Sequence, residues 1–143
     1  MTRPLIWLRA ASILTLLYAL GHTAGMPWTP HGVGQSVVDA MQSVTFDVMG
    51  STRSYWSFYQ GFGLALSVMM LFQAILLWQI APLVDKGIAG TRMIVWMQLA
   101  CVAANTAVVV HYIFIVPAFF GLAIMACLGV ALLPRREIFS PAP

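Results

Sequence analysis

Two histidines and a few amide and phenol side chains interrupt long apolar stretches, and these are the residues of the sequence that could do chemistry. A neutral imidazole can ligate a haem iron or another metal, or form a hydrogen bond with a quinone-like headgroup. Polar residues within apolar helices tend to face the protein interior or a cavity. The candidates for lining a ligand pocket are His22, Tyr18, Gln60, Asn105, His111 and Tyr112.

The same residues also have a structural interpretation. In it, His22 and His111 lie at the membrane interface in contact with headgroup water, while Gln60 and Asn105 bridge neighbouring helices. Gln98 is likewise expected to donate a hydrogen bond to another helix. Two histidines alone do not define a haem site, and no metal site is predicted. The cofactor therefore stays unknown, with haem or a quinone as the candidates.

Composition indicates which elements must position these side chains. The chain has 143 residues, of which 61% are hydrophobic and 8% charged, whereas soluble domains carry about 25% charged residues. We expect an all-α membrane protein, a four-transmembrane-helix bundle with a short amphipathic helix in its outer loop. The predicted helices are about 5–24, 55–80, 91–112 and 116–133, and the outer loop is 25–54, within a single transmembrane domain of residues 1–143.

The last two helices come from one continuous apolar stretch, residues 92 to 133. As a single helix it would be about 63 Å long, twice the thickness of the hydrocarbon core. A turn is therefore expected between His111 and Pro117, because proline starts helices well and disfavours helical geometry in the residue before it.

The outer loop has the one water-facing composition in the chain. Valines and a methionine at helical spacing between about Gln35 and Val48 predict the short amphipathic helix. Its charged residues and one histidine are candidates for a lid over the pocket: His31, Asp39, Asp47 and Arg53. Asp47 and Arg53 are further expected to form an ion pair.

The positions of the basic residues predict the orientation. Short cytoplasmic loops carry an excess of Lys and Arg. Six basic residues fall on one side of the four-helix arrangement, namely Arg3, Arg9, Lys86, Arg92, Arg135 and Arg136, and Arg53 falls on the other. This distribution predicts an inner-membrane protein with both termini in the cytoplasm. It also explains the net charge of +3 without a nucleic-acid partner, so the bilayer is the expected partner.

Small residues predict which helix faces pack together. On the third predicted helix, Ala100, Ala104 and Ala107 share a stripe with His111, which would turn that histidine towards the protein. An alternative is that these alanines, together with Ala103, and the segment from Gly121 to Gly129 form exposed faces for a partner subunit or another copy of the chain.

Several kinds of chemistry lack support in the sequence. No carboxylate lies within the four predicted helices, which disfavours a proton-coupled antiporter. No nucleophile has a partnered base, and no glycine loop has phosphate-binding spacing. The sequence therefore leaves open whether the protein is an enzyme.

Two short motifs carry a resemblance. The stretches Gly21-His22-Thr23-Ala24-Gly25 and Arg53-Ser54-Tyr55-Trp56-Ser57-Phe58-Tyr59-Gln60-Gly61-Phe62-Gly63 resemble a family of small, uncharacterised bacterial four-helix integral membrane proteins. The overall plan also looks like DoxX-like proteins, some of which are associated with respiratory or redox complexes. The glycines of both motifs are expected to permit close helix approach beside His22 and Gln60.

Two classes of function follow. The leading hypothesis is a small membrane protein that binds a lipophilic small molecule or serves as an accessory subunit of a membrane complex. The alternative is a membrane-embedded redox or isomerase enzyme that uses His22 and His111 in a polar pocket near the outer face. The first apolar run also resembles a secretory signal, and its cleavage is an open alternative.

Overall fold

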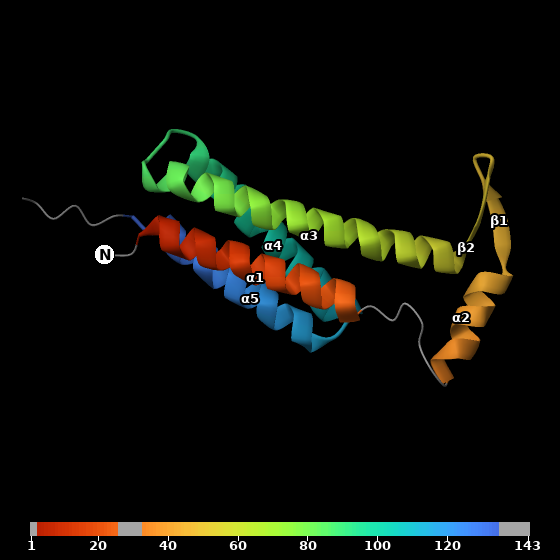
Figure 1. The fold of residues 1–143 in the computed structure, drawn as a ribbon. Coiled ribbons are helices and arrows are strands. Elements are labelled where there is room, and N and C mark those ends of the chain that lie inside the picture. Colours follow the sequence, from red (N-terminus) through yellow and green to blue (C-terminus); the bar gives the residue numbers. More distant parts are fainter. Residues whose placement is uncertain (1–2, 26–32, 135–143) are drawn as a thin grey trace, which may run out of the picture. The chain divides into compact units, whose positions relative to one another are not determined.

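The computed structural model describes residues 3–25 and 33–134, and it is almost entirely helical (Figure 1). Its elements are α1 (Pro4–Gly25), α2 (Val33–Ser43), β1 (Thr45–Val48), β2 (Ser51–Ser54), α3 (Tyr55–Asp85), α4 (Thr91–Tyr112) and α5 (Ile115–Leu132). α1, α3, α4 and α5 are long and apolar enough to cross a membrane, which indicates a multi-pass membrane protein.

The chain divides into two compact units, and both α1 and α3 contribute to each. The helical unit comprises Met1–Tyr18 and Leu71–Pro143 and contains α4 and α5. The hairpin unit comprises Ala19–Met70 and contains α2, β1 and β2.

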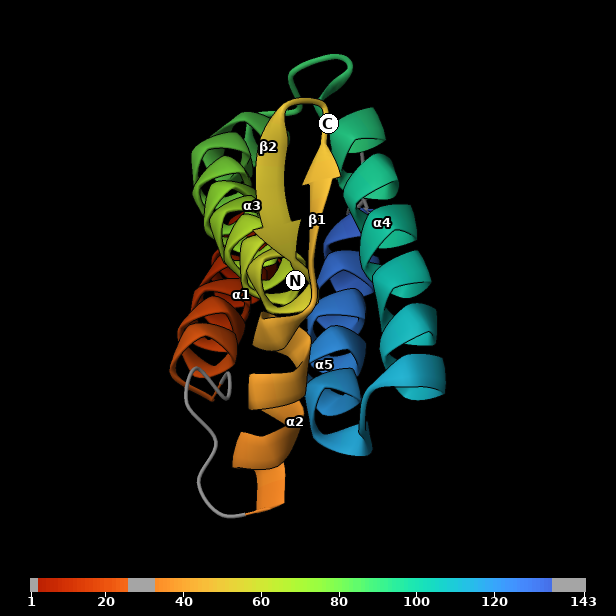
Figure 2. The same ribbon diagram turned by 90° about the vertical axis from the view of Figure 1, so that its right-hand side faces the viewer.

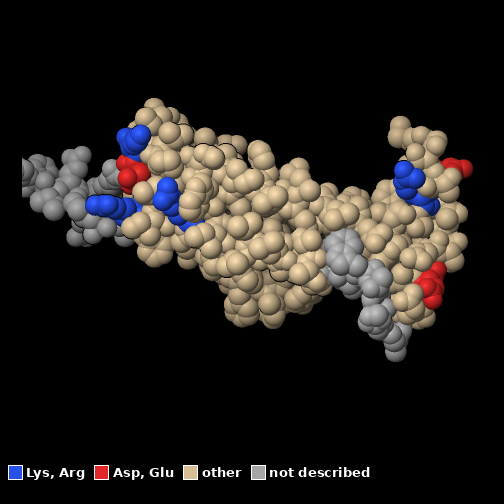
Figure 3. Space-filling view, in the orientation of Figure 1, with Lys and Arg blue, Asp and Glu red and all other residues tan. Residues whose placement is uncertain are grey.

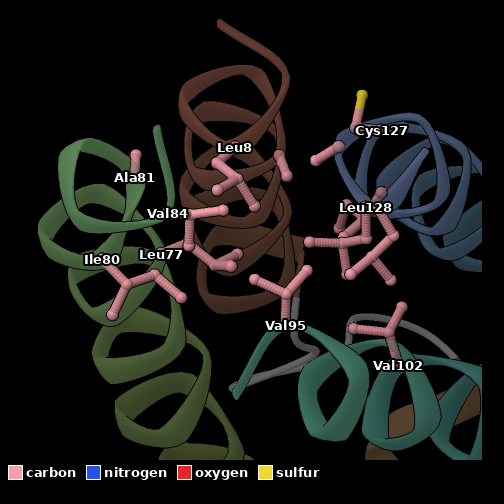
Figure 4. Packing of buried hydrophobic residues seen from close by; sticks show 13 residues of the cluster. Leu8, Leu77, Ile80, Ala81, Val84, Val95, Val102, Cys127 and Leu128 are labelled. Carbon is pink, nitrogen blue, oxygen red and sulfur yellow. The ribbon is translucent and has the colours of Figure 1, made fainter. Parts of the chain in front are cut away.

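The core of the helical unit is assembled from all four long helices (Figure 4). Leu8 of α1, Leu77 of α3 and Leu128 of α5 are fully buried, and Val95 of α4 is buried with them. These side chains are aliphatic, so they fill the interior without leaving polar atoms that need partners. The core lies at the end of the unit where α1 begins and α3 is followed by α4.

Local sequence signals explain how the helices of this unit begin and end. α3 ends in a Schellman motif, in which Gly87 has φ 73° and donates to the Val84 carbonyl, while Ile88 donates to the Leu83 carbonyl. Glycine adopts this left-handed conformation at no steric cost. Pro82 lies within α3 rather than ending it, so the helix runs five residues beyond the predicted Ile80.

The turn between α4 and α5 lies where Pro117 predicted it. Ile113 and Phe114 connect the two helices, and Pro117 occupies the first turn of α5, where its missing N–H costs no helical hydrogen bond. The two helices pack along their length, side by side in Figure 2. Gly121 of α5 faces Thr106 of α4 so closely that an added Cβ would lie 2.1 Å from the threonine Oγ1.

The hairpin unit departs from the sequence prediction. α2 ends at Ser43, and residues predicted to continue it form an antiparallel hairpin in which Phe46 pairs with Arg53 and Asp47 with Thr52 (Figure 2). The helix predicted from about Gln35 to Val48 is therefore wrong over its last five residues. The hairpin is anchored to α3 by Phe46, whose ring stacks on Phe58 at 5.8 Å between centroids.

Candidate functional site

The polar groups of the hairpin unit meet where the end of α1 lies against the first half of α3. His22 Nε2 lies 3.2 Å from the carbonyl oxygen of Gly63. Because a carbonyl can only accept, Nε2 must carry the proton in this contact. In a neutral His22 the other ring nitrogen, Nδ1, is then an acceptor. The contact therefore fixes both the direction of the imidazole and its tautomer.

Two hydroxyl groups extend this contact along α1 and α3. Thr23 Oγ1 lies 2.8 Å from Ser67 Oγ, and Ser67 Oγ donates to the Gly63 carbonyl at 3.2 Å. The Gly63 carbonyl thus accepts from a serine of its own helix and from the histidine of α1. The sequence prediction included His22 but not Thr23. The position of Thr23 next to His22, at the end of an apolar helix, is the signal that could have identified Thr23.

Gln60 lies one turn before Gly63 on the same side of α3, because residues three apart are neighbours on a helix surface. Its side chain is half-buried. The hairpin unit therefore places Gln60 and His22 around the same stretch of α3 and supplies both amide and imidazole groups there.

The helical unit brings together two other predicted candidates. Tyr18 and Asn105 are joined by a side-chain hydrogen bond, and the ring of Tyr18 stacks on Phe120 with the centroids 5.5 Å apart. α1, α4 and α5 are thereby connected by one tyrosine. The hydroxyl and the ring of Tyr18 are both engaged within the helical unit.

His111 and Tyr112 lie at the end of α4, in edge-to-face contact with their ring centroids 4.4 Å apart. Both side chains are exposed. The prediction that the alanine stripe turns His111 towards the protein is wrong, since Ala100, Ala104 and Ala107 are exposed as well. The buried stripe of α4 consists instead of Thr91, Val95, Gln98, Val102, Thr106 and Val109.

The lid candidates make local contacts. Asp39 accepts a hydrogen bond from Gln35 at 2.8 Å on the exposed side of α2. Asp47 accepts one from Thr52 at 2.7 Å, and Arg53 donates to the Thr52 carbonyl at 2.7 Å. The predicted ion pair between Asp47 and Arg53 is wrong, because the hairpin register puts these two residues on opposite faces. His31 lies outside the described residues.

Three glycines of the two motifs do not mark close helix contacts. A Cβ added at Gly21, Gly25 or Gly61 would meet nothing within 4 Å. The prediction of close approach at these three positions is therefore wrong. The tight glycine contact is at Gly121, which is buried against Thr106 and so does not belong to an exposed face of α5.

Most polar side chains in the interior have partners. Ser12 of α1 donates to the Ala74 carbonyl of α3 at 2.7 Å, and Thr106 donates to the Val102 carbonyl of its own helix at 2.7 Å. Gln98 is the exception in the described part of the chain, because its buried Nε2 has no hydrogen-bond partner there. The prediction that Gln98 bridges two helices through this nitrogen is wrong.

No group of three or more His, Cys, Asp or Glu side chains that could hold a metal ion occurs among residues 3–25 and 33–134. His22 and Gln60 belong to the hairpin unit, whereas Tyr18, Asn105, His111 and Tyr112 belong to the helical unit. Comparison with models of protein families, with curated proteins and with solved structures found no match. The resemblance based on the two motifs thus stays a prediction.

Proposed function

We propose that this protein is a non-catalytic, multi-pass protein of the bacterial inner membrane that serves as an accessory subunit of a membrane complex. The observation that carries the proposal is the exposed alanine face of α4, formed by Ala100, Ala104 and Ala107. Small side chains let two membrane helices approach closely, which is what drives their association in lipid. The partner would be a transmembrane helix of another protein.

The opposite side of α4 supports this assignment. Val95, Val102 and Val109 are buried in the helical unit, so α4 already has one face committed to its own chain. Helices that face lipid alone have no need of small residues on that side, since lipid chains pack against large aliphatic side chains equally well. The alanine face is therefore the part of α4 suited to a second protein.

The distribution of charge supports the proposed orientation. In Figure 3 the Lys and Arg atoms of the helical unit gather at the end where α1 begins and α3 is followed by α4. The described cationic residues of this unit are Arg3, Arg9, Lys86 and Arg92. Excess positive charge on one side favours the cytoplasm for that side, which supports the proposal that both termini are cytoplasmic.

Native mass spectrometry of the protein released from its own membranes in a mild detergent tests the proposal. We expect a partner chain with the wild type and its loss with Ala104→Leu, because leucine would hold the helices apart. Ala126→Leu is the matched control, since Ala126 is an exposed alanine on α5. A bare chain in all three spectra, or equal loss in both variants, would contradict the accessory role.

His22 supports a second candidate, the binding of a lipophilic small molecule. Its fixed imidazole and the half-buried Gln60 offer an acceptor and an amide to a carbonyl or hydroxyl headgroup. The same spectrum would show a retained quinone or haem, and His22→Ala should release it. A haem held by His22 would also give a Soret band that His22→Ala abolishes. A redox or isomerase activity would require such a molecule to be turned over.

A further inference from the structure

Arg9 makes an unusual contact for an arginine in an apolar helix. Its guanidinium carbon lies 4.6 Å from the centre of the Trp78 ring, so the charge rests on the face of the indole. Both residues belong to the helical unit, and Trp78 is 44% exposed. The stack holds a cation at a fixed place on the surface formed by α1 and α3.

The depth of Arg9 determines what can surround it. It lies five residues after Pro4, the first residue of α1, which is about 8 Å along the helix axis. An arginine that far into a spanning helix extends towards the headgroup region, because an isolated charge in hydrocarbon is very costly. The guanidinium is therefore expected at the level of the lipid phosphates.

The stack leaves the donors of Arg9 available. Guanidinium N–H groups point outward in the plane of the group, so a ring against its face does not block them. Within the described residues, the Trp78 contact is the interaction that the structure gives to Arg9. Arg92 differs, since its guanidinium donates to the Leu132 carbonyl at the end of α5. Arg9 therefore presents a preorganised fork of donors without an acceptor among the residues that the structure describes.

The surface next to this pair is suited to acyl chains. Ile13 lies one turn further along α1 from Arg9, and Ile75 lies one turn back along α3 from Trp78, so both are deeper in the span. Their side chains are 49% and 51% exposed. The Ser12 hydroxyl donates to the Ala74 carbonyl between the two helices and holds them together at this level.

We infer that Arg9 and Trp78 bind the headgroup phosphate of an anionic phospholipid, with its acyl chains against Ile13 and Ile75. The phosphate accepts from the guanidinium edge, which matches its geometry in a bidentate way. A lipid with net negative charge is preferred, because Arg3, Lys86 and Arg92 add positive charge at the same end of the unit. Asp85 offsets only one of these charges. The site is independent of the proposed partner face on α4.

The test is a lipid titration of the purified full-length protein, read by native mass spectrometry. The probes are phosphatidylglycerol and phosphatidylcholine with identical acyl chains. Wild type should bind phosphatidylglycerol about tenfold more tightly than Arg9→Gln does, and Arg9→Lys should fall between them because lysine keeps the charge and loses the fork. The matched control is Arg53→Gln, an exposed arginine on β2, which should bind like wild type.

Three outcomes would overturn the inference. The first is equal binding of phosphatidylglycerol by wild type and Arg9→Gln, and the second is equal affinity of wild type for both lipids. The third is loss of the difference between wild type and Arg9→Gln in excess inorganic phosphate, which would indicate a site for a free anion. Trp78→Leu keeps the cation and removes the ring, so weaker lipid binding by this variant would support the inference even if Arg9→Gln does not fold.

Discussion

The contact between Gly121 and Thr106 offers the sharpest test of how the helical unit is packed. A Cβ added at Gly121 would lie 2.1 Å from Thr106 Oγ1 and 3.1 Å from both Cβ and Cγ2 of the same residue. Ordinary van der Waals contact begins at 3.4 Å. Thr106 cannot relieve the clash by rotation alone, because its Cβ stays in place and its hydroxyl donates to the Val102 carbonyl. α4 and α5 must therefore move apart.

The magnitude follows from two opposing terms. Overpacking of an interior costs about 1–3 kcal/mol, while replacing a helical glycine by alanine gains about 1 kcal/mol. We expect Gly121→Ala to lower the free energy of unfolding by up to about 2 kcal/mol. Gly129→Ala is the control on the same helix, since its added Cβ would meet nothing within 4 Å, and it should raise stability by up to about 1 kcal/mol.

The assay is unfolding by SDS in a mild detergent, followed by the far-ultraviolet circular dichroism of the helices. Thr106→Ala removes the two atoms at 2.1 and 3.1 Å beyond its Cβ, so adding it to Gly121→Ala should recover part of the lost stability. A double-mutant cycle then measures the contact directly. Equal stability of Gly121→Ala and Gly129→Ala would refute the packing described for α4 and α5.

Three further changes test other parts of the structure. Gln98→Met should raise the free energy of unfolding by about 1 kcal/mol, because it removes a buried donor that has no partner; the same SDS titration measures it, and a decrease would mean that the amide is bonded. Met49→Asn should stabilise the hairpin by about 1 kcal/mol, because Met49 has φ 50° beside Gly50 at φ 81° and asparagine tolerates this turn conformation better. Slower amide hydrogen exchange at Val48 and Ser51 would show the gain, and unchanged exchange would contradict the turn geometry. The third change compares Phe114→Cys with Ala89→Cys in a chain whose Cys101 and Cys127 are replaced by alanine. In membranes open on both sides, a membrane-impermeant maleimide should label Ala89→Cys and not Phe114→Cys, because Ala89 lies between Lys86 and Arg92 and Phe114 lies in an exposed turn without charged residues. Equal labelling would place the α4–α5 turn in water.

The positions of the long helices were predictable because their signals are local. Each signal acts within a few residues: an apolar run of spanning length marks a helix, Gly87 marks the end of α3, and Pro117 marks the start of α5. The four long apolar helices of the all-α prediction are confirmed.

The hairpin was missed because the same residues fit two periods. Val44 and Val48 are four apart, as on one side of a helix, but the residues between them also alternate as in a strand. Gly50 was the signal for a turn, since two residues with positive φ close the shortest hairpins. In the hairpin, Gly50 occupies a turn position with φ 81°, a conformation that glycine adopts without steric cost.

The buried face of α4 could not be chosen from the sequence. Both sides of the helix are apolar, so hydrophobic periodicity carries no information about which one faces the protein. The small-residue rule then selected the alanines, whereas the structure buries Val95, Val102 and Val109. The error on His111 followed from that choice, because it shares the alanine side.

The contacts of the interior polar groups indicate where the function of this protein lies. Ser12, Thr106 and Tyr18 are engaged within the helical unit, and His22 is engaged within the hairpin unit. Groups that already satisfy one another gain little from a ligand that would have to displace those bonds. At the described surface, the guanidinium edge of Arg9 and the alanine face of α4 have unused capacity for partners. Elsewhere in the described chain, Nε2 of Gln98 is unpaired but buried, and Nδ1 of His22 is an acceptor left open beside the Gly63 contact. These two features of the described surface are the ones on which the proposed recognition of lipid and of another membrane helix depends.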